Sequence, residues 1–520
     1  MKTMIERVFG RTDFKLFWPT LIMLLATLIY LVMDPKGAAS TFSSVYTWLI
    51  MHFSSGFLMG VGLVVLVCFV IAFSGYGTLK LGRDEDEPEF SWFAWAAMMF
   101  SASIGGAAIM WTAAEPLYHL MGSSWVIDQG TRGTPAGIPM AIQLTIFDWG
   151  IHGWALFALG GLAIAFPAYR KNKPMTVGTG LYGLLGDKAN TGVWGKLSDI
   201  LGAVSTIGGV ATALGMIIMA LAWAINHLFG VDLGLGGKIG LLIFIIVCYI
   251  ASAVSGIHRG IKILSVVNVW LALFMAAFLL VMGPTEWLLN LMTQTVGAYF
   301  DRFIEMTFWT DAGHFTDGVP DQRSWLNWWV VFYWLWWATY IPFCGGFLAR
   351  ISKGRTLREY LLGSIFGPLV ILFVIFTVWG GNACYMEVTG QAQIWAEVQK
   401  NFGAGVYMVM EQFTGGTALS YLFFLSVLFF AVTTADSASY FVSMQMSHGS
   451  TDPTIAMRAL WGIIIGFLGI FFMVAGGGGT SALNALKGLS IIVGTPFFLV
   501  EIAFIFSIFK MFGLAKRGKF

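Results

Sequence analysis

Long apolar runs constrain the fold of this chain more than any other feature. Twelve stretches of about 20 residues each are apolar enough to cross the hydrocarbon core of a bilayer as helices. They lie near residues 16–33, 53–75, 91–113, 139–168, 196–227, 239–256, 262–284, 327–350, 359–382, 417–446, 457–475 and 488–510. Because a helix satisfies its own backbone polar groups inside lipid, the sequence predicts an all-α integral membrane protein with 12 transmembrane helices.

The composition excludes several other classes of protein. Hydrophobic residues make up 58% of the chain and charged residues 11%, whereas soluble domains carry roughly 25% charged residues. The net charge of +2 gives no reason to expect nucleic acid as a partner. Membrane lipid is therefore the expected surrounding of the chain.

Basic residues predict the orientation of the spans. If the spans alternate in direction, all but seven of the 29 Lys and Arg residues lie in loops and tails on the side of the N-terminus. The seven exceptions are Lys36, Arg132, Lys238, Arg302, Arg323, Lys400 and Lys487. Since basic loops stay in the cytoplasm, we expect a multi-pass protein of a bacterial-type inner (plasma) membrane with both termini cytoplasmic.

One predicted span, within residues 330–356, combines aromatic side chains with helix-breaking residues. Its aromatic residues include Trp334, Trp336, Trp337 and Tyr340, and they are followed by Pro342, Gly345 and Gly346. Indole faces attract quaternary ammonium groups, and helices broken inside a bilayer face protein or a wet cavity. The span therefore predicts an aromatic cage for a methylated cation in the middle of the membrane.

Paired glycines suggest an internal repeat. Gly105 and Gly106 lie within the third predicted span, Gly345 and Gly346 lie within the eighth, and five spans begin at each of these two. Such a pattern is typical of an inverted repeat whose first helices are discontinuous at the binding site. Glycine pairs are also common in packed membrane helices, so coincidence stays open at this point.

Hydroxyl side chains concentrate in the tenth predicted span. Thr433 and Thr434 precede Asp436, Ser437 and Ser439 within an apolar run. Hydroxyl and carbonyl oxygens are ligands that hard cations prefer, and an acid inside a membrane is seldom idle, so the segment predicts a sodium site. The alternative is that these hydroxyls bond their own helix or its neighbours.

These segments resemble the betaine/choline/carnitine transporter family over about residues 15–510. The resemblance rests on MMFSASIGGAAIMWTAAEPLYHL at 98–120, DWGIHGWALFALGGLAIAF at 148–166, FYWLWWATYIPFCGGFLARISKGRT at 332–356 and TTADSAS at 433–439. It implies a LeuT-like 5+5 inverted repeat of helices 3–7 and 8–12, two extra N-terminal helices and a homotrimer. The implied division is a short cytoplasmic N-terminus (1–15), helices 1–2 (16–84), the first repeat (85–285), an outer connection with an interfacial helix (286–326), the second repeat (327–510) and a short cytoplasmic C-terminus (511–520).

The resemblance also implies which residues bind the substrate. Trp149, Trp154 and Trp337 match the family's cage tryptophans, and Trp336 matches a residue at the outer approach. Four positions depart from the family pattern. Phe157 replaces a tyrosine, Tyr340 stands where some relatives have tryptophan, and Ala107 shortens a glycine run. Asp148 stands where the family usually has histidine. Its carboxylate is expected either to steady a cationic substrate or accept a proton, or to serve as a structural partner for a backbone amide or for His152.

Sodium is the coupling ion that the resemblance implies. The matching ligands are the carbonyls of Ser101, Ile104 and Phe430 and the hydroxyls of Thr433 and Thr434. A second family site is matched by Thr206 and Phe343, but its other threonine position holds Val210. Sodium-independent exchangers of the family carry methionine at the position of Cys344 and arginine at that of Asn268, which favours symport here.

The sequence thus predicts a secondary active transporter rather than an enzyme. We expect sodium-coupled uptake of a small methylated onium osmolyte by alternating access. The substrates to consider are glycine betaine, choline, carnitine and dimethylsulfoniopropionate. Proton-coupled choline-type uptake and sodium-independent exchange are alternatives. A channel or a membrane enzyme is a remote one, since internal charges are scattered and the seven histidines show no ligand spacing.

Overall fold

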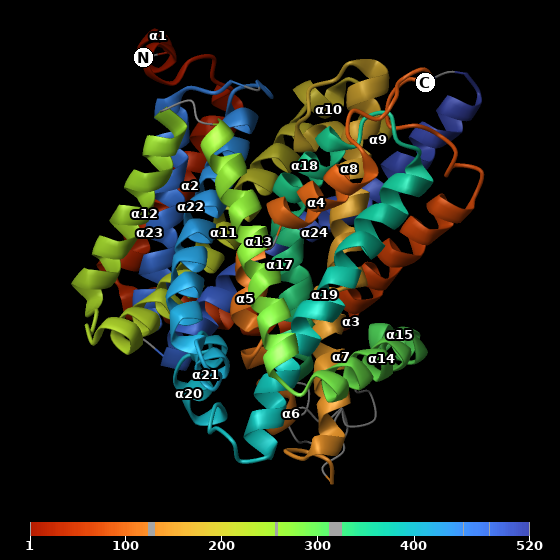
Figure 1. Ribbon diagram of the computed structural model, residues 1–520. Helices are drawn as coiled ribbons and strands as arrows, with labels where there is room; N and C mark the ends of the chain where they lie inside the picture. Colours follow the sequence, from red (N-terminus) through yellow and green to blue (C-terminus); the bar gives the residue numbers. More distant parts are fainter. Residues whose placement is uncertain are drawn as a thin grey trace.

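The computed structural model of the protein describes residues 2–103, 105–122, 130–254, 258–310, 325–450, 452–477, 479–518 and 520. Across these residues the regular structure is helical, apart from one antiparallel bridge between Lys80 and Thr356. Most of the long helices run along one bundle, and both chain ends lie at the same end of it (Figure 1). The molecule is a multi-pass helical membrane protein, as the sequence predicted.

The first half of the chain contains two long N-terminal helices, a segmented third helix and a central pair. Its main helices are α1 (Lys2–Phe9), α2 (Phe14–Met33), α3 (Pro35–Phe73), α4 (Trp92–Ser103), α5 (Gly105–Trp111), α6 (Ala114–Met121), α7 (Ile138–Trp149), α8 (Ile151–Lys171), α9 (Tyr182–Leu185), α10 (Lys188–Thr191), α11 (Val193–Phe229), α12 (Leu235–Val254) and α13 (His258–Met282). Two short 3₁₀ helices, η1 (Pro135–Gly137) and η2 (Val177–Leu181), connect them.

The second half begins with two helices at the end of the bundle opposite the chain termini (Figure 1). Its elements are α14 (Thr285–Asp301), α15 (Phe303–Phe308), η4 (Asn327–Val331), α17 (Phe332–Tyr340), η5 (Ile341–Gly345), α18 (Gly346–Ile351), α19 (Leu357–Val388), α20 (Trp395–Lys400), α21 (Ala404–Glu411), α22 (Gly416–Met446), α23 (Ile455–Ala475) and α24 (Gly479–Lys516).

Eight helices in the described residues are long and apolar enough to cross a membrane, or nine if the bent pair Trp270–Met282 and Thr285–Asp301 is one span. The eight coincide with eight of the twelve predicted ranges. The other four ranges contain α4 with α5, α12, α13, and the segments from η4 to α18. Of these, α12 offers the shorter apolar stretch Leu235–Ala251, and Trp270–Met282 of α13 belongs to the bent pair. The predicted count of twelve and the inverted repeat therefore stay predictions. α14 departs from the preceding helix at 114°, and its predicted position at the membrane interface also stays a prediction.

Burial separates helices at the rim of the bundle from helices at its centre. Along α2 the apolar side chains of Ile22, Ile29 and Met33 are exposed, at 62%, 56% and 80%, as expected for a surface covered by lipid. In contrast, 94% of the most apolar 18-residue stretch of α11 is buried, and the corresponding stretch of the α7–α8 span is completely buried. These two spans form the wall on which the candidate site is built.

The predicted interruption of the 327–350 span takes the form of π-helical turns rather than an unwound gap. The π-helical segment η5 contains Pro342, which lacks an N–H and disturbs the regular helical ladder. At this point α8 approaches closely, because a Cβ atom on Gly161 would lie 2.5 Å from the carbonyl oxygen of Gly345. The interruption predicted at Gly105 lies beside Ile104, which is outside the described residues.

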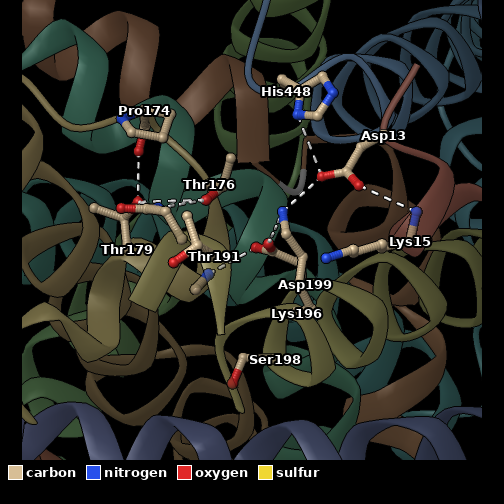
Figure 2. A network of polar contacts seen from close by, with 12 residues as sticks. Asp13, Lys15, Pro174, Thr176, Thr179, Thr191, Lys196, Ser198, Asp199 and His448 are labelled. Atoms are coloured by element: carbon tan, nitrogen blue, oxygen red, sulfur yellow. Dashed lines mark hydrogen bonds and ion pairs between the residues drawn. The ribbon is translucent and has the colours of Figure 1, made fainter. Parts of the chain in front are cut away.

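A polar network fastens the end of the bundle that carries the chain termini (Figure 2). Asp13 caps α2 and accepts a hydrogen bond from Lys196 Nζ at 2.6 Å. His448 Nδ1 lies 3.4 Å from the same carboxylate, and Lys196 Nζ lies 3.4 Å from Asp199. Asp199 in turn accepts from the backbone N–H of Gly178. The network joins the start of α2, the start of α11, η2 and the α22–α23 connection.

Candidate functional site

Four of the predicted cage residues form one cluster of aromatic rings. The ring centroid of Trp337 lies 6.0 Å from that of Trp149, 6.0 Å from that of Trp154 and 5.0 Å from that of Phe157. All four side chains are buried, and the Nε1 of Trp154 has no hydrogen-bond partner in the described residues. The cluster combines α7, α8 and α17, so it depends on tertiary packing and not on one helix face.

Glycines at the junction of α7 and α8 allow these rings to meet. α7 ends at Trp149 and α8 begins at Ile151, with Gly150 between them. A Cβ atom on Gly153 would lie 2.3 Å from the indole of Trp337, so the ring of Trp337 lies directly on the α8 backbone. The Nε1 of Trp337 donates to the carbonyl oxygen of Asp148 at 3.1 Å.

Trp336 and Tyr340 continue the aromatic cluster toward α11. The ring of Trp336 lies 6.1 Å from that of Trp149 and 6.2 Å from that of Tyr340. Trp336 Nε1 donates to the carbonyl oxygen of Gly209 at 3.3 Å, and the hydroxyl of Tyr340 donates to the same oxygen at 3.5 Å. Both side chains are therefore held by α11.

The described part of the predicted sodium site lies on α22. The Thr433 hydroxyl donates to the carbonyl oxygens of Phe429 at 3.0 Å and Phe430 at 3.2 Å, and Thr434 is half-buried. Ile104 lies outside the described residues. The side chains of Ser101 and Ala107 are also outside the described part of the structure. The carbonyl contributions of Ser101 and Ile104 therefore stay predictions.

The residues predicted for a second sodium site lie on two adjoining elements. Thr206 on α11 is buried, and its hydroxyl has no hydrogen-bond partner in the described residues. Phe343 lies in η5, with its ring 6.4 Å from that of Tyr340. Since Thr206 lies three residues before Gly209, it shares the helix face that contacts Tyr340.

An arginine on a neighbouring helix balances the charge of Asp436. Arg458 on α23 donates from Nη2 to Asp436 Oδ1 at 2.5 Å, and both side chains are largely buried. Removing one partner of a buried pair leaves an uncompensated charge, so this pair gives Asp436 a structural role between α22 and α23.

Asp148 lies in a buried polar cluster beside the cage. Its Oδ2 is 3.7 Å from His119 Nε2, and the same nitrogen is 3.6 Å from Glu115 Oε1. His152, the partner considered from the sequence, instead pairs its Nε2 with the Thr307 hydroxyl at 2.9 Å. Glu115 bonds the cage directly, because its Oε2 accepts from Trp149 Nε1 at 2.8 Å.

Comparison with known proteins identifies the family. The sequence model of the betaine/carnitine/choline family transporters matches residues 15–517. The chain belongs to this family. It is 32% identical to the glycine betaine transporter OpuD of Bacillus subtilis, over 96% of this chain and 94% of that protein. Family membership makes it a transporter and not an enzyme.

Two further relatives of this betaine/carnitine/choline family transporter extend the comparison. The high-affinity choline transport protein of Escherichia coli K12 is 33% identical over 91% of this chain and 67% of that protein. The betaine/ectoine transporter LcoP of Corynebacterium glutamicum is 33% identical over 96% of this chain and 77% of that protein. The named substrates differ among these relatives.

The sequence analysis did not predict four residues of the site. Glu115, His119, Tyr333 and Lys487 all lie at or beside the buried cluster. Glu115 and His119 are four residues apart in a helical segment, which is a signal that the sequence contained. Lys487 was assigned to an outer loop. It is instead 4% exposed on α24, with its Nζ 4.4 Å from the centroid of Trp329.

Proposed function

We propose that the protein imports a small methylated onium osmolyte by sodium-coupled symport. The observation that carries the proposal is the contiguous cluster of Trp149, Trp154, Phe157 and Trp337 rings in the buried centre of the bundle. A quaternary ammonium group cannot donate hydrogen bonds, so aromatic faces are the natural protein groups to hold it. Glycine betaine, choline, carnitine and dimethylsulfoniopropionate all carry such a methylated cationic head.

The named substrates of the relatives support this class of substrate. Glycine betaine and choline transporters are both similar to this chain over more than nine tenths of its length. The aromatic faces of the cage would recognise methyl groups and positive charge, which the candidate substrates share. We therefore propose the onium class as a whole and place glycine betaine and choline first.

Coupling to sodium is supported by hydroxyl oxygens on α11 and α22. The Thr206 hydroxyl has no hydrogen-bond partner in the described residues and is available to a cation. The Thr433 hydroxyl donates to carbonyl oxygens of its own helix and keeps lone pairs that a cation can use. The proposal includes a LeuT-like inverted repeat, a homotrimer in the lipid of a bacterial-type inner membrane, and cytoplasmic termini. Transport would then proceed by rocking one part of the bundle against another around the fixed cage.

Uptake into proteoliposomes tests the proposal. With an inward sodium gradient, radiolabelled glycine betaine or choline should accumulate inside, and carnitine and dimethylsulfoniopropionate should be tested in parallel. An ionophore that collapses the gradient should abolish accumulation. Equal uptake from potassium and sodium buffers at constant pH would contradict sodium coupling. Absence of uptake for all four compounds would contradict the onium class.

The hydroxyls of α22 provide a sharper test of the ion site. Replacing Thr433 and Thr434 together by Ala removes two oxygen ligands, so the sodium concentration for half-maximal uptake should rise at least about tenfold. Affinity for the substrate at saturating sodium should change less. Thr389→Ala is a control, because Thr389 lies at the end of α19 and bonds only its own helix. An unchanged sodium dependence in the double variant would place the ion elsewhere.

A further inference from the structure

The buried cluster beside the cage holds more acid than base. Glu115 on α6 and Asp148 on α7 are fully buried. Among the described residues, Lys487 on α24 is a basic side chain beside them, since the ring of Trp329 lies 4.4 Å from Lys487 Nζ and 4.7 Å from the ring of His119. Lys487 Nζ donates to the carbonyl oxygen of Trp328 at 3.2 Å and lies among aromatic rings. Because an uncompensated buried charge costs several kcal/mol, one lysine balances one carboxylate, and the other carboxyl group requires a proton.

A positively charged His119 could also balance the second carboxylate, but the hydrogen bond that His119 accepts excludes this form of the ring. The Nε1–H of Trp325 points at His119 Nδ1 at 3.1 Å, and an indole nitrogen only donates. Nδ1 therefore holds a lone pair, and the single ring hydrogen sits on Nε2, toward both carboxyl groups. The three side chains lie close enough together to hold a metal ion, but this tautomer leaves His119 Nε2 unable to act as a ligand.

The two carboxyl groups differ in their surroundings. Glu115 Oε2 accepts two hydrogen bonds, from Trp149 Nε1 at 2.8 Å and from the Tyr333 hydroxyl. Neither carboxyl oxygen of Asp148 has a hydrogen-bond partner in the described residues. The proton is therefore better placed on Asp148.

The cluster contacts both the cage and a surface pocket. Trp149 bonds Glu115 and lies in the cage, and Trp337 bonds the backbone of Asp148, so movement of the cage displaces both acids. On the other side Trp325, the partner of His119, lines a pocket together with Phe147, Arg302, Glu305, Met306, Trp309, Leu326 and Val330. Trp325 therefore lies between this pocket and His119.

We propose that Glu115, His119 and Asp148 form one buried proton-binding site, which takes up a proton with the substrate and releases it on the opposite side of the membrane. The proton forms an O–H bond at the Asp148 carboxyl group and leaves as the cage reopens, so no other reactant is needed. This inference rests on the proposed onium uptake and adds a proton to the ions that accompany the substrate.

Proton movement can be measured together with substrate uptake. Proteoliposomes loaded with a pH-sensitive dye, without an initial pH gradient, receive glycine betaine or choline under a sodium gradient. For the wild type we expect the interior to acidify in step with uptake, at about one proton per substrate. In Asp148→Asn this ratio should fall to near zero, and in Asp148→Glu it should recover. Uptake without acidification in the wild type would overturn the proposal, as would an unchanged ratio in Asp148→Asn.

Glu501 provides the matched control. It is also a fully buried carboxyl group in the bundle, its oxygens have no hydrogen-bond partner in the described residues, and it lies on α24 away from the cluster, against Gly160 of α8. Glu501→Gln should keep the wild-type ratio. Loss of acidification in Glu501→Gln with a normal ratio in Asp148→Asn would move the proton to Glu501 and overturn the assignment.

Infrared spectroscopy separates this inference from the proposed function. A protonated carboxyl group has a C=O stretching band that an ionised one lacks, and Asp148→Asn should remove one such band from the spectrum of the full-length protein in lipid. If no onium compound is taken up but the band is lost in the variant, the proton site stands and the proposed substrate is wrong. If the variant and the wild type have the same band, the proton site is wrong whatever the substrate. Elution of Asp148→Asn at the wild-type volume in size-exclusion chromatography shows that it is folded.

Discussion

Trp337 connects several parts of the site. Its ring contacts those of Trp149, Trp154 and Phe157, and its Nε1 donates to the backbone of Asp148. It therefore touches the α7–α8 span on both sides of Gly150. A substrate head bound against this ring would act on the cage and on the acid cluster at the same time.

Truncating Trp337 tests the cage at this scale. Cation–π attraction in a desolvated site is worth about 2 kcal/mol, so Trp337→Ala should weaken substrate binding by about tenfold or more. Tryptophan fluorescence titration with glycine betaine and choline measures the affinity. Trp48→Ala is the control, since Trp48 is 53% exposed on α3. Equal affinity of wild type and Trp337→Ala would remove the cage from the proposal.

The sequence indicated the cage residues but not their polar partners, and the reason is physical. Trp337 stands out because aromatic residues inside a broken apolar span are unusual, and Trp149 was indicated by the resemblance to the family. Lys487 was misplaced because a single charge near the end of an apolar run is usually read as part of a loop. Only the packing of α24 against η4 and α17 shows that aromatic rings enclose it. Long-range pairing of this kind has no local sequence signal.

Among the elements, α8 and η5 define the most sensitive contact. Gly161 and Gly345 bring the two backbones together where the helical ladder of the 327–350 span widens. The residues that cause the widening, Pro342 and the glycines, were visible in the sequence as breakers. Whether a breaker produces an unwound gap or a π-helical turn depends on the neighbouring helix that fills the space, and the sequence does not contain that information.

A methyl group at this contact should separate the two elements. In Gly161→Ala the added Cβ atom would lie 2.4 Å from the Tyr360 hydroxyl and 2.5 Å from the Gly345 carbonyl oxygen. Overpacking of this kind costs about 1–3 kcal/mol, so we expect a lower melting temperature in detergent and slower uptake. Gly297→Ala in α14 is the control, because nothing lies within 4 Å of its Cβ position. If Gly161→Ala melts at the same temperature as the wild type, the two backbones can separate at this contact without loss of stability.

At the scale of the whole molecule, the topology is defined by which elements lie at each end of the bundle. The chain termini and α10 lie at one end of the bundle, and α20 lies at the other (Figure 1). Basic residues predicted which end faces the cytoplasm, because that preference depends on composition and not on packing. The number of spans was harder to predict, since bent and segmented helices do not present one continuous apolar run.

Labelling of introduced cysteines tests the predicted orientation. Lys400→Cys on α20 should react with a membrane-impermeant maleimide in intact cells, whereas Lys188→Cys on α10 should react only in inverted vesicles. Both lysines are exposed. The native cysteines Cys68, Cys344 and Cys384 are buried and Cys248 is half-buried, so the wild type measures the background. The opposite labelling pattern would reverse the orientation.

The Asp13 network has a consequence for the energetics of the transport cycle. Lys196 belongs to the first predicted repeat and His448 to the second, and both meet at one carboxylate from the segment that precedes α2 (Figure 2). If the two repeats rock apart at this end, at least one of these contacts must break. The N-terminal segment then holds the two repeats together at this end. The strength of the Asp13 contacts sets how often the site opens toward the side of the chain termini.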